Sequence, residues 1–337
     1  MVVVEPETAG RSTGATRRPM RAVWIEAGQV SLRDLPRPTR PAGHALLRLT
    51  LAGICNTDLE LQRGYYGFVG VPGHEFVAEV IEADDPAWLG ERVVGEINLA
   101  CGHCDWCARD LGRHCPTRTV LGIVRHPGAF AEYFTLPEAN LRRVPQHVSD
   151  EHAVFTEPVA AACEILEQVA IPVGSAVAVL GDGKLGLLIA QVLAAHGLHV
   201  RLFGRHADKL RIAARAGVET ELATGALPTA AYRYVVDATG SPEGLSQAVR
   251  MTEPRGTLIM KSTVSGQVAV DTAPIIVNEL TLVGSRCGRF EPAIELIAAG
   301  KLHLDEMIAG RYPLSRAGDA FRHAASRGAL KVLLTGE

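Results

Sequence analysis

The pattern of apolar and polar positions changes character near residue 150. Before that point, apolar residues form short runs separated by clusters of glycine and proline. Runs with this punctuation are typical of β-strands joined by turns, so we predict a mostly β, barrel-like domain. The expected strands cover residues 21–25, 45–51, 76–81, 90–96 and 129–134.

After residue 150, short apolar runs alternate with stretches of helical periodicity. Apolar residues recur at helical spacing over residues 151–170, and residues 187–195 continue as a second apolar helix. The runs between the helical stretches predict strands at residues 177–180, 200–203, 234–236, 257–260 and 281–283. Strands that alternate with helices in this way form a parallel, doubly wound sheet.

The two ends of the chain complete the expected domain organisation. From about residue 292 the pattern is helical again, and an apolar strand at residues 330–334 is expected to return to the first domain. The expected domains are therefore residues 20–155 with 292–337, and residues 156–291. Residues 1–19 lack the apolar core of a signal peptide. We expect them to be a disordered tail, or to follow an upstream start codon with the folded part beginning near Met20.

Composition narrows the range of partners. With 47% apolar and 21% charged residues, the chain has the composition of a soluble globular protein. A net charge of only -3 gives no support to a nucleic acid or an anionic membrane as partner. No apolar run approaches the length that spans a bilayer.

Four of the seven cysteines lie in one short segment, C-G-H-C-D-W-C-A-R-D-L-G-R-H-C. They are Cys101, Cys104, Cys107 and Cys115. Gaps of two residues let successive sulfurs point at one centre, and four thiolates leave no open position, which predicts a structural zinc site. A ferredoxin-type cluster needs a shorter last gap, and four unligated thiols would be prone to oxidation. This cysteine usage favours a reducing compartment, and we expect the cytoplasm.

A second group of candidate ligands lies between residues 53 and 75: Cys55, Thr57, Asp58, His74 and Glu75. A mixture of thiolate, imidazole and carboxylate suits a catalytic zinc, which keeps three protein ligands and one open position. Asp58 either fixes the tautomer of His74 or, as a turn residue, bonds its own backbone. Taken alone, Cys55 and His74 could also be ordinary core residues.

The strand at residues 177–180 is followed by G-D-G-K-L-G, which contains Gly181, Gly183 and Gly186. A G-x-G-x-x-G motif between a strand and a helix predicts a dinucleotide site, because the glycines permit a tight turn and close approach to the pyrophosphate. Lys184, Leu185 and Thr239 are expected beside the same cofactor. The next strand ends in Gly204, Arg205 and His206 instead of the acid that binds the ribose of NAD. We therefore favour NADP, with Arg205 binding its 2′-phosphate, over the alternative that Arg205 is a solvated loop residue.

These motifs together resemble the zinc-dependent medium-chain dehydrogenase/reductase family, which includes alcohol, polyol and threonine dehydrogenases. The resemblance covers nearly the whole chain from Met20, and its motifs stand in family order. They are G-I-C-N-T-D, V-P-G-H-E, the four-cysteine segment, T-E-P, the glycine motif and V-D-A-T-G-S. The resemblance implies a GroES-like β-barrel catalytic domain and a Rossmann domain inserted before its C-terminal end.

The resemblance also implies two zinc ions per chain, one structural and one catalytic. Cys55 and His74 would be catalytic ligands, and the third would be Glu75 or Glu157. Liver-type alcohol dehydrogenases carry a cysteine where this chain has Glu157, so the chain is more similar to the polyol branch. Many members have a histidine where Glu60 stands, which leaves the route of the proton relay open. Lys331 stands where relatives carry a basic residue paired with an active-site carboxylate.

The implied activity is hydride transfer between an alcohol or polyol, or the corresponding carbonyl compound, and NAD(P). Zinc would lower the pKa of the alcohol, and Thr57 would accept the proton. Two alternatives are a zinc-free quinone or enone reductase and a non-catalytic nucleotide-binding or sensor protein of the same fold. Relatives in this family are usually dimers or tetramers.

Overall fold

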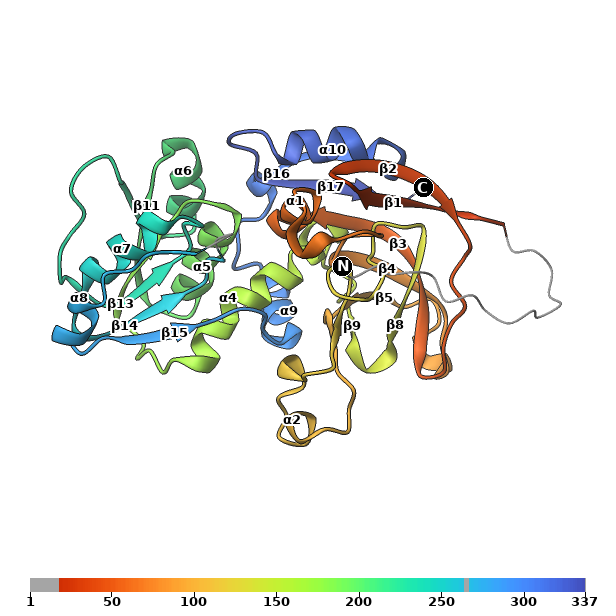
Figure 1. The fold of residues 1–337 in the computed structure, drawn as a ribbon, viewed down its shortest axis with the longest axis horizontal. Coiled ribbons are helices and arrows are strands. Elements are labelled where there is room, and N and C mark those ends of the chain that lie inside the picture. The colour runs from red at the N-terminus through yellow and green to blue at the C-terminus, as the bar shows by residue number, and fades with distance from the viewer. Residues whose placement is uncertain (1–17, 264–266, 337) are drawn as a thin grey trace. The chain divides into compact units, whose positions relative to one another are not determined.

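The computed structural model describes residues 18–263 and 267–336 (Figure 1). Backbone contacts divide the chain into two compact units. Unit 1 ends at Phe155 and resumes at Ile308, and unit 2 runs from Thr156 to Met307. The expected boundary at residue 292 therefore lies earlier than the point at which the chain re-enters unit 1. Most of the expected N-terminal tail, residues 1–17, lies outside the described residues.

Unit 1 is built on a sheet in which β16, β17, β3, β4, β5 and β9 follow one another and β8 also pairs with β3. These strands are β3 (His44–Ile54), β4 (Glu75–Glu82), β5 (Arg92–Gly95), β8 (Tyr133–Pro137), β9 (Leu141–Arg143), β16 (Ile308–Pro313) and β17 (Lys331–Thr335). Two smaller ribbons pair β1 (Met20–Glu26) with β2 (Gln29–Leu35) and β6 (Asn98–Leu99) with β7 (Thr119–Val120). Its helices are α1 (Asn56–Gln62), α2 (Asp105–Ala108), α3 (Asp150–Ala153) and α10 (Ala317–Ala324).

Strand β3 organises unit 1, because it pairs with β4, β8 and β17. Its central residues alternate between buried and exposed positions, with Arg48 and Thr50 exposed. The C-terminal strand β17 runs antiparallel to β3 and pairs Val332 with Ile54. This pairing brings the last residues of the chain beside the segment that carries Cys55.

Unit 2 contains six parallel strands in the order β12, β11, β10, β13, β14 and β15. They are β10 (Ala176–Leu180), β11 (His199–Gly204), β12 (Glu219–Leu222), β13 (Tyr232–Asp237), β14 (Thr252–Met260) and β15 (Thr281–Gly284). The helices are α4 (Thr156–Gln168), α5 (Lys184–Ala195), α6 (Ala207–Arg215), α7 (Pro242–Met251), α8 (Ala273–Val277) and α9 (Phe290–Ala298). This strand order is that of the Rossmann fold, so the predicted doubly wound sheet is confirmed.

The two sheets bury their strands differently. Residues Val177–Leu180 of β10 are all buried, as expected for a central strand covered by helices on both faces. Strand β2, in contrast, is mostly exposed, and the sequence pattern did not predict it. The strand expected at residues 129–134 begins only at Tyr133, because Ala129 and Phe130 bond to the loop at Pro72 and Gly73 instead.

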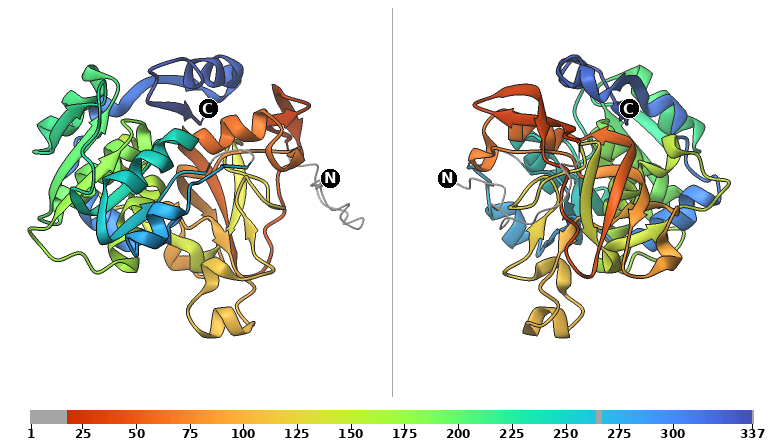
Figure 2. Two further views of the ribbon diagram at one scale, coloured as in Figure 1. Left: turned by 60° about the vertical axis from the view of Figure 1, so that its left-hand side comes forward. Right: turned by 90° about the vertical axis from the view of Figure 1, so that its right-hand side faces the viewer.

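One segment of unit 1 projects away from its sheet. It contains α2 and the four clustered cysteines, and Figures 1 and 2 show it as the yellow-orange lobe that extends beyond the strands. We call residues 101–118 the cysteine lobe. In the part of the chain that the structure describes, no helix has the length and apolar character needed to cross a membrane.

Candidate functional site

Cys55 stands between the end of β3 and the start of α1, where it is the N-cap residue of the helix. Its sulfur accepts a hydrogen bond from the backbone N–H of Thr57 at 3.5 Å. Its own backbone N–H donates to Oδ2 of Asp58 at 2.8 Å. These reciprocal bonds form a capping box, which fixes the start of the helix and the direction of the thiol. The Thr57 hydroxyl lies 3.7 Å from the same sulfur.

Asp58 links this helix start to the loop that precedes β4. Its side chain is fully buried, and Oδ1 accepts a hydrogen bond from the backbone N–H of Gly73 at 3.2 Å. The same oxygen lies 3.4 Å from Nδ1 of His74, in a contact that is not a regular hydrogen bond. Asp58 thus caps its own helix and also stands behind the imidazole.

Glu75, the first residue of β4, is paired with Lys331, the first residue of β17. Lys331 Nζ donates to Glu75 Oε2, and both side chains are 1% exposed. The other carboxylate oxygen, Oε1, is buried and has no hydrogen-bond partner among the described residues. A Cβ atom at Gly53 would lie 2.5 Å from Glu75 Oε2, so glycine is needed there for the ion pair to fit beside β3.

Cys55, His74 and Glu75 each offer a ligand atom, and these three atoms lie within 4.8 Å of one another. Burial lowers the pKa of His74, but the negative charges of Asp58 and Cys55 outweigh it and raise that pKa well above its usual value. A largely buried cluster whose negative charges favour a proton on His74 would also stabilise a bound cation. With the free Oε1 atom of Glu75, this donor set fits a catalytic zinc with one open position.

The cysteine lobe brings its four sulfurs together at the tip of unit 1. Cys104 Sγ lies 3.5 Å from the sulfur of Cys107 and 3.8 Å from that of Cys115, and Cys101 Sγ lies 3.9 Å from that of Cys107. A tetrahedron of thiolates around zinc has edges of about 3.8 Å, given Zn–S bonds of about 2.3 Å. All four cysteines are free, and the spacing is far beyond a disulfide bond. The geometry fits a closed zinc site.

The electrostatics of the lobe also fit a metal that binds thiolates. A backbone hydrogen bond at Cys101 and the hydroxyl of Thr117 lower the pKa of Cys115 to about 6. Burial, together with the neighbouring Cys104, raises the pKa of Cys107 to about 11. The cluster therefore holds one thiolate readily, and a cation is needed to favour several at once.

In unit 2, the turn between β10 and α5 has the geometry of a dinucleotide loop. Gly181 adopts φ +109, and a Cβ there would lie 2.6 Å from the carbonyl oxygen of Ala238. Lys184 and Leu185 open α5 directly after Gly183, the N-cap residue. Thr239 follows β13 and is held by Asp237, whose Oδ1 accepts bonds from its N–H and hydroxyl. The predicted cofactor-binding residues of this turn therefore gather at the carboxyl ends of neighbouring strands.

Asp182 is a residue of this turn whose role the sequence pattern did not reveal. Its Oδ2 accepts hydrogen bonds from the backbone N–H groups of Arg205 and His206, at 2.7 and 2.6 Å. The strand β11 itself ends without an acid, as its sequence indicates. The expectation that no carboxylate lies near this strand end is nevertheless wrong, because the carboxylate of Asp182 reaches it from the preceding turn. The Arg205 side chain is exposed and forms no ion pair in the described part of the chain.

Three further residues do not belong to these ligand groups, and two of them, Glu157 and Glu60, are singled out by the sequence. Glu157 is in the first turn of α4 in unit 2, and its role as a ligand stays a prediction. Glu60 pairs with Arg63 on α1 at 2.5 Å. Tyr66 is exposed and has φ +59, an unusual backbone conformation for a residue other than glycine.

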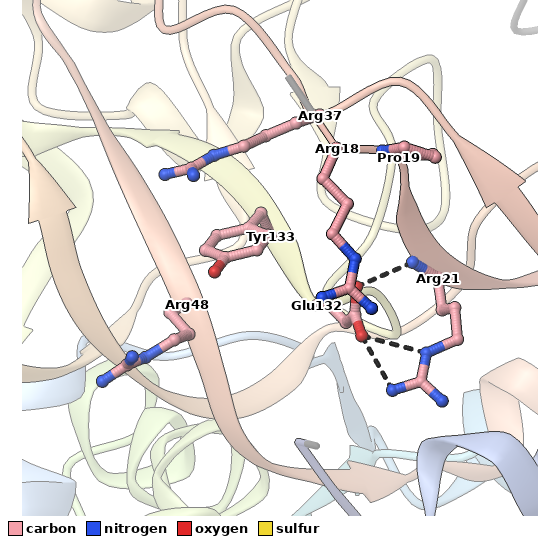
Figure 3. A pocket seen from close by; sticks show the side chains of 7 residues that line it. All are labelled: Arg18, Pro19, Arg21, Arg37, Arg48, Glu132 and Tyr133. Carbon is pink, nitrogen blue, oxygen red and sulfur yellow. Dashed lines mark hydrogen bonds and ion pairs between the residues drawn. The ribbon is translucent and has the colours of Figure 1, made fainter. Parts of the chain in front are cut away.

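Unit 1 also has a hollow of about 440 Å³ that is rich in arginine (Figure 3). It is lined by Arg18, Pro19, Arg21, Arg37, Arg48, Glu132 and Tyr133. Figure 3 shows Arg21 turned onto Glu132, which accepts three hydrogen bonds from it, of 2.9 to 3.0 Å. Arg37 and Arg48 pair with carboxylates outside the hollow, at 3.6 and 2.5 Å. The hollow contains none of the candidate ligands, and most of its charge is already neutralised.

Comparison with known proteins places both units in one family. Residues 41–146 match the alcohol dehydrogenase GroES-like domain, and residues 185–299 match the zinc-binding dehydrogenase domain. The chain is 29% identical to an erythritol/L-threitol dehydrogenase from Mycolicibacterium smegmatis over 321 residues, which is 84% of this chain and 88% of that protein.

A solved structure gives the deciding similarity. A putative zinc-binding dehydrogenase from Sinorhizobium meliloti, bound to NADP, is 30% identical, with a TM-score of 0.87 over 95% of this chain and 100% of that one. The chain belongs to the zinc-dependent medium-chain dehydrogenase/reductase family. It is thus an alcohol dehydrogenase-like oxidoreductase with a GroES-like and a Rossmann domain. A second solved structure, described as a short chain alcohol dehydrogenase from Escherichia coli in complex with NADH, is 27% identical, with a TM-score of 0.87 over 95% of this chain and 100% of that one.

Proposed function

We propose that this chain is a zinc-dependent dehydrogenase that transfers hydride between an alcohol or polyol, or the corresponding carbonyl compound, and NADP. The observation that carries this proposal is the group of half-buried Cys55 and buried His74 and Glu75. Its mixed ligands and free carboxylate oxygen suit a metal that activates a substrate, and the family of the chain performs this type of reaction.

Two zinc ions per chain are part of the proposal. Cys55 and His74 would hold the catalytic ion, with Glu75 or Glu157 as the third ligand, and the cysteine lobe would hold a structural one. The free Oε1 atom of Glu75 supports Glu75, whereas its pairing with Lys331 leaves the carboxylate less available. Glu157, in the first turn of α4, remains the alternative on the basis of its T-E-P motif.

The surrounding residues have distinct roles in this proposal. A bound zinc ion supplies Lewis acidity, which lowers the pKa of an alcohol. Asp58 keeps the His74 ring oriented from behind, and Lys331 fixes one oxygen of Glu75. The Thr57 hydroxyl lies beside the Cys55 sulfur, where it would accept the proton of the alcohol and pass it toward the cofactor ribose.

The residues at the end of β11 support NADP as the cofactor. Gly181, Gly183, Lys184, Leu185, Gly186 and Thr239 would surround the pyrophosphate and the adjoining ribose. Arg205 is exposed at the end of β11, and its guanidinium could bind a 2′-phosphate through two parallel hydrogen bonds. The carboxylate of Asp182 is bonded inward, so it does not present its charge to that phosphate.

One relative suggests a substrate class, and the cysteines suggest a cellular compartment. The erythritol/L-threitol relative supports a polyol of about four carbons as the first substrate to test. Seven free cysteines support a reducing compartment such as the cytoplasm, and a homodimer or homotetramer is the assembly that we expect.

The test combines metal content with turnover. Protein purified without chelators should contain two zinc ions per chain by elemental analysis, and it should reduce NADP in the presence of four- to six-carbon polyols. Dialysis against a strong chelator should abolish turnover, and added zinc should restore it. One zinc ion per chain, with turnover unaffected by the chelator, would overturn the zinc mechanism and favour the zinc-free reductase. Cofactor binding without turnover on any alcohol or carbonyl compound would favour the sensor protein.

A further inference from the structure

One carboxylate joins the two loops of unit 2 that a dinucleotide meets. Asp182 lies between Gly181 and Gly183 in the glycine turn, and its Oδ2 accepts from the backbone N–H groups of Arg205 and His206. Nδ1 of His206 lies 3.0 and 3.1 Å from the two oxygens of the same carboxylate. A single side chain therefore holds the backbone and one ring of the turn between β11 and α6.

These bonds leave Asp182 little capacity for a ligand. A carboxylate has about four acceptor positions, and the turn occupies three of them with two N–H groups and an imidazole. Asp182 is also only 7% exposed. It is therefore poorly placed to bind the ribose hydroxyls in the way that an acid at a strand end does.

Asp182 also excludes such an acid from the usual position. A Cβ atom at Gly204, the last residue of β11, would lie 2.6 Å from Cβ and Oδ2 of Asp182. No side chain fits at residue 204 while Asp182 adopts this conformation. The absence of an acid at the strand end is thus a consequence of packing against the glycine turn.

The side chains of Arg205 and His206 are left available to a ligand at this turn. Nδ1 of His206 faces Asp182, so Nε2, on the other side of the ring, is directed away from that carboxylate. The His206 side chain is 33% exposed, and the residue is the N-cap of α6, which has nine residues. Arg205 beside it is exposed and, in the described part of the chain, has no ion pair. Donors and a helix N-terminus at one turn are suited to a phosphate group.

We propose that Asp182 is a positioning residue that determines cofactor choice, by fixing Arg205 and His206 so that they bind the 2′-phosphate of NADP(H). The inference rests on the proposed cofactor site and adds His206 to it. By charge alone, a carboxylate would repel a phosphate group. In this proposal the Asp182 carboxylate instead favours phosphate binding.

The test is the affinity of the protein for NADPH and for NADH, measured by fluorescence titration without substrate. In D182N the negative charge is lost, and the contact between residue 182 and Nδ1 of His206 weakens. We expect the dissociation constant of NADPH to rise about tenfold, as for the loss of one hydrogen bond to a charged group, and that of NADH to change less than about twofold. H206N keeps a donor near Asp182 and removes the outward nitrogen, so it should show the same selective loss.

D208N is the matched control, because Asp208 is exposed in the first turn of α6 and, in the described part of the chain, its side chain forms no hydrogen bond to the turn. Both variants remove one negative charge near the same turn. If charge alone matters, both should bind NADPH more tightly than the parent protein. If position matters, D182N should bind it more weakly while D208N binds it equally or more tightly.

The outcomes separate this inference from the proposed function. Tighter NADPH binding by D182N, or equal losses for NADPH and NADH, would overturn the positioning role. A parent protein that binds NADH more tightly than NADPH would refute the cofactor preference by itself. Even then, the ratio of the two dissociation constants should shift toward NADH in D182N and H206N if Asp182 acts as proposed.

Discussion

The two groups of candidate metal ligands in unit 1 are stabilised in opposite ways. The four thiols of the cysteine lobe come from one short segment that projects from the sheet, and Cys101, Cys104 and Cys107 are each partly exposed. Cys55, His74 and Glu75 come from the ends of two strands, and Asp58 and Lys331 hold them through buried contacts. We therefore expect the lobe to depend on a metal for its order, whereas the second group is already held by contacts within the protein.

The difference shows why one group suits a structural ion and the other a catalytic one. Four thiolates complete a tetrahedron and leave no position for substrate. The second group keeps an open position, and its supporting residues prevent rearrangement when ligands change there. Variants that remove a ligand or a supporting residue should therefore have different consequences in the two places.

The largest effect is expected from C55S. The loss of one of three zinc ligands should remove an ion that contributes several kcal/mol to the reaction, so kcat/KM should fall about a thousandfold or more. Zinc content should fall from two ions to one per chain, while the thermal midpoint changes little, because Ser is itself a good N-cap residue. Steady-state kinetics and elemental analysis test this.

C163A is the control for that variant, because Cys163 is a buried thiol of unit 2 outside both ligand groups. It should retain both zinc ions and nearly full turnover. If C55S keeps two zinc ions, or loses no more activity than C163A, Cys55 is not a ligand.

The next effect in size is expected from K331M. This change leaves the charge of Glu75 buried without its partner, which should lower the free energy of unfolding by about 3–5 kcal/mol. The measurement is urea denaturation. The double variant K331M/E75Q should recover part of the loss, and K301M, at an exposed lysine, should show almost none. Equal stability of K331M and K301M would contradict the buried ion pair.

The smallest effect on catalysis is expected from C104S, although it too should remove one zinc ion per chain. The cysteine lobe lacks an apolar core, so it should become open to proteolysis within residues 101–118. Turnover by the intact chain should change less than about threefold, because the second ligand group does not depend on the lobe. Mass spectrometry of limited digests locates the cleavage, and loss of turnover before any cleavage would contradict this independence.

Sequence reasoning succeeded where the chemistry is local. The four cysteines are separated by gaps of two, two and seven residues, so their pattern alone predicted a common centre. The glycine motif likewise carries its strand and its helix with it. These features need no information about distant parts of the chain.

The rest depends on contacts between residues far apart in the sequence. Lys331 meets Glu75 across 256 positions, and only the pairing of β17 with β3 brings them together. Asp182 reaches residues 23 and 24 positions later, because parallel strands place two loops at one edge of the sheet. The exposed strand β2 has too few buried positions for its periodicity to be seen.

Gly53 has a consequence for how this protein can vary between species. The space above its Cα is filled by the Glu75 carboxylate and by Cδ of Lys331, which would lie 3.1 Å from a Cβ. A chain that keeps the ion pair cannot acquire even a methyl group at residue 53 without moving it. Substitutions at residues 53, 75 and 331 should therefore occur together in homologues, and an alanine at residue 53 should mark lineages that have already lost the lysine.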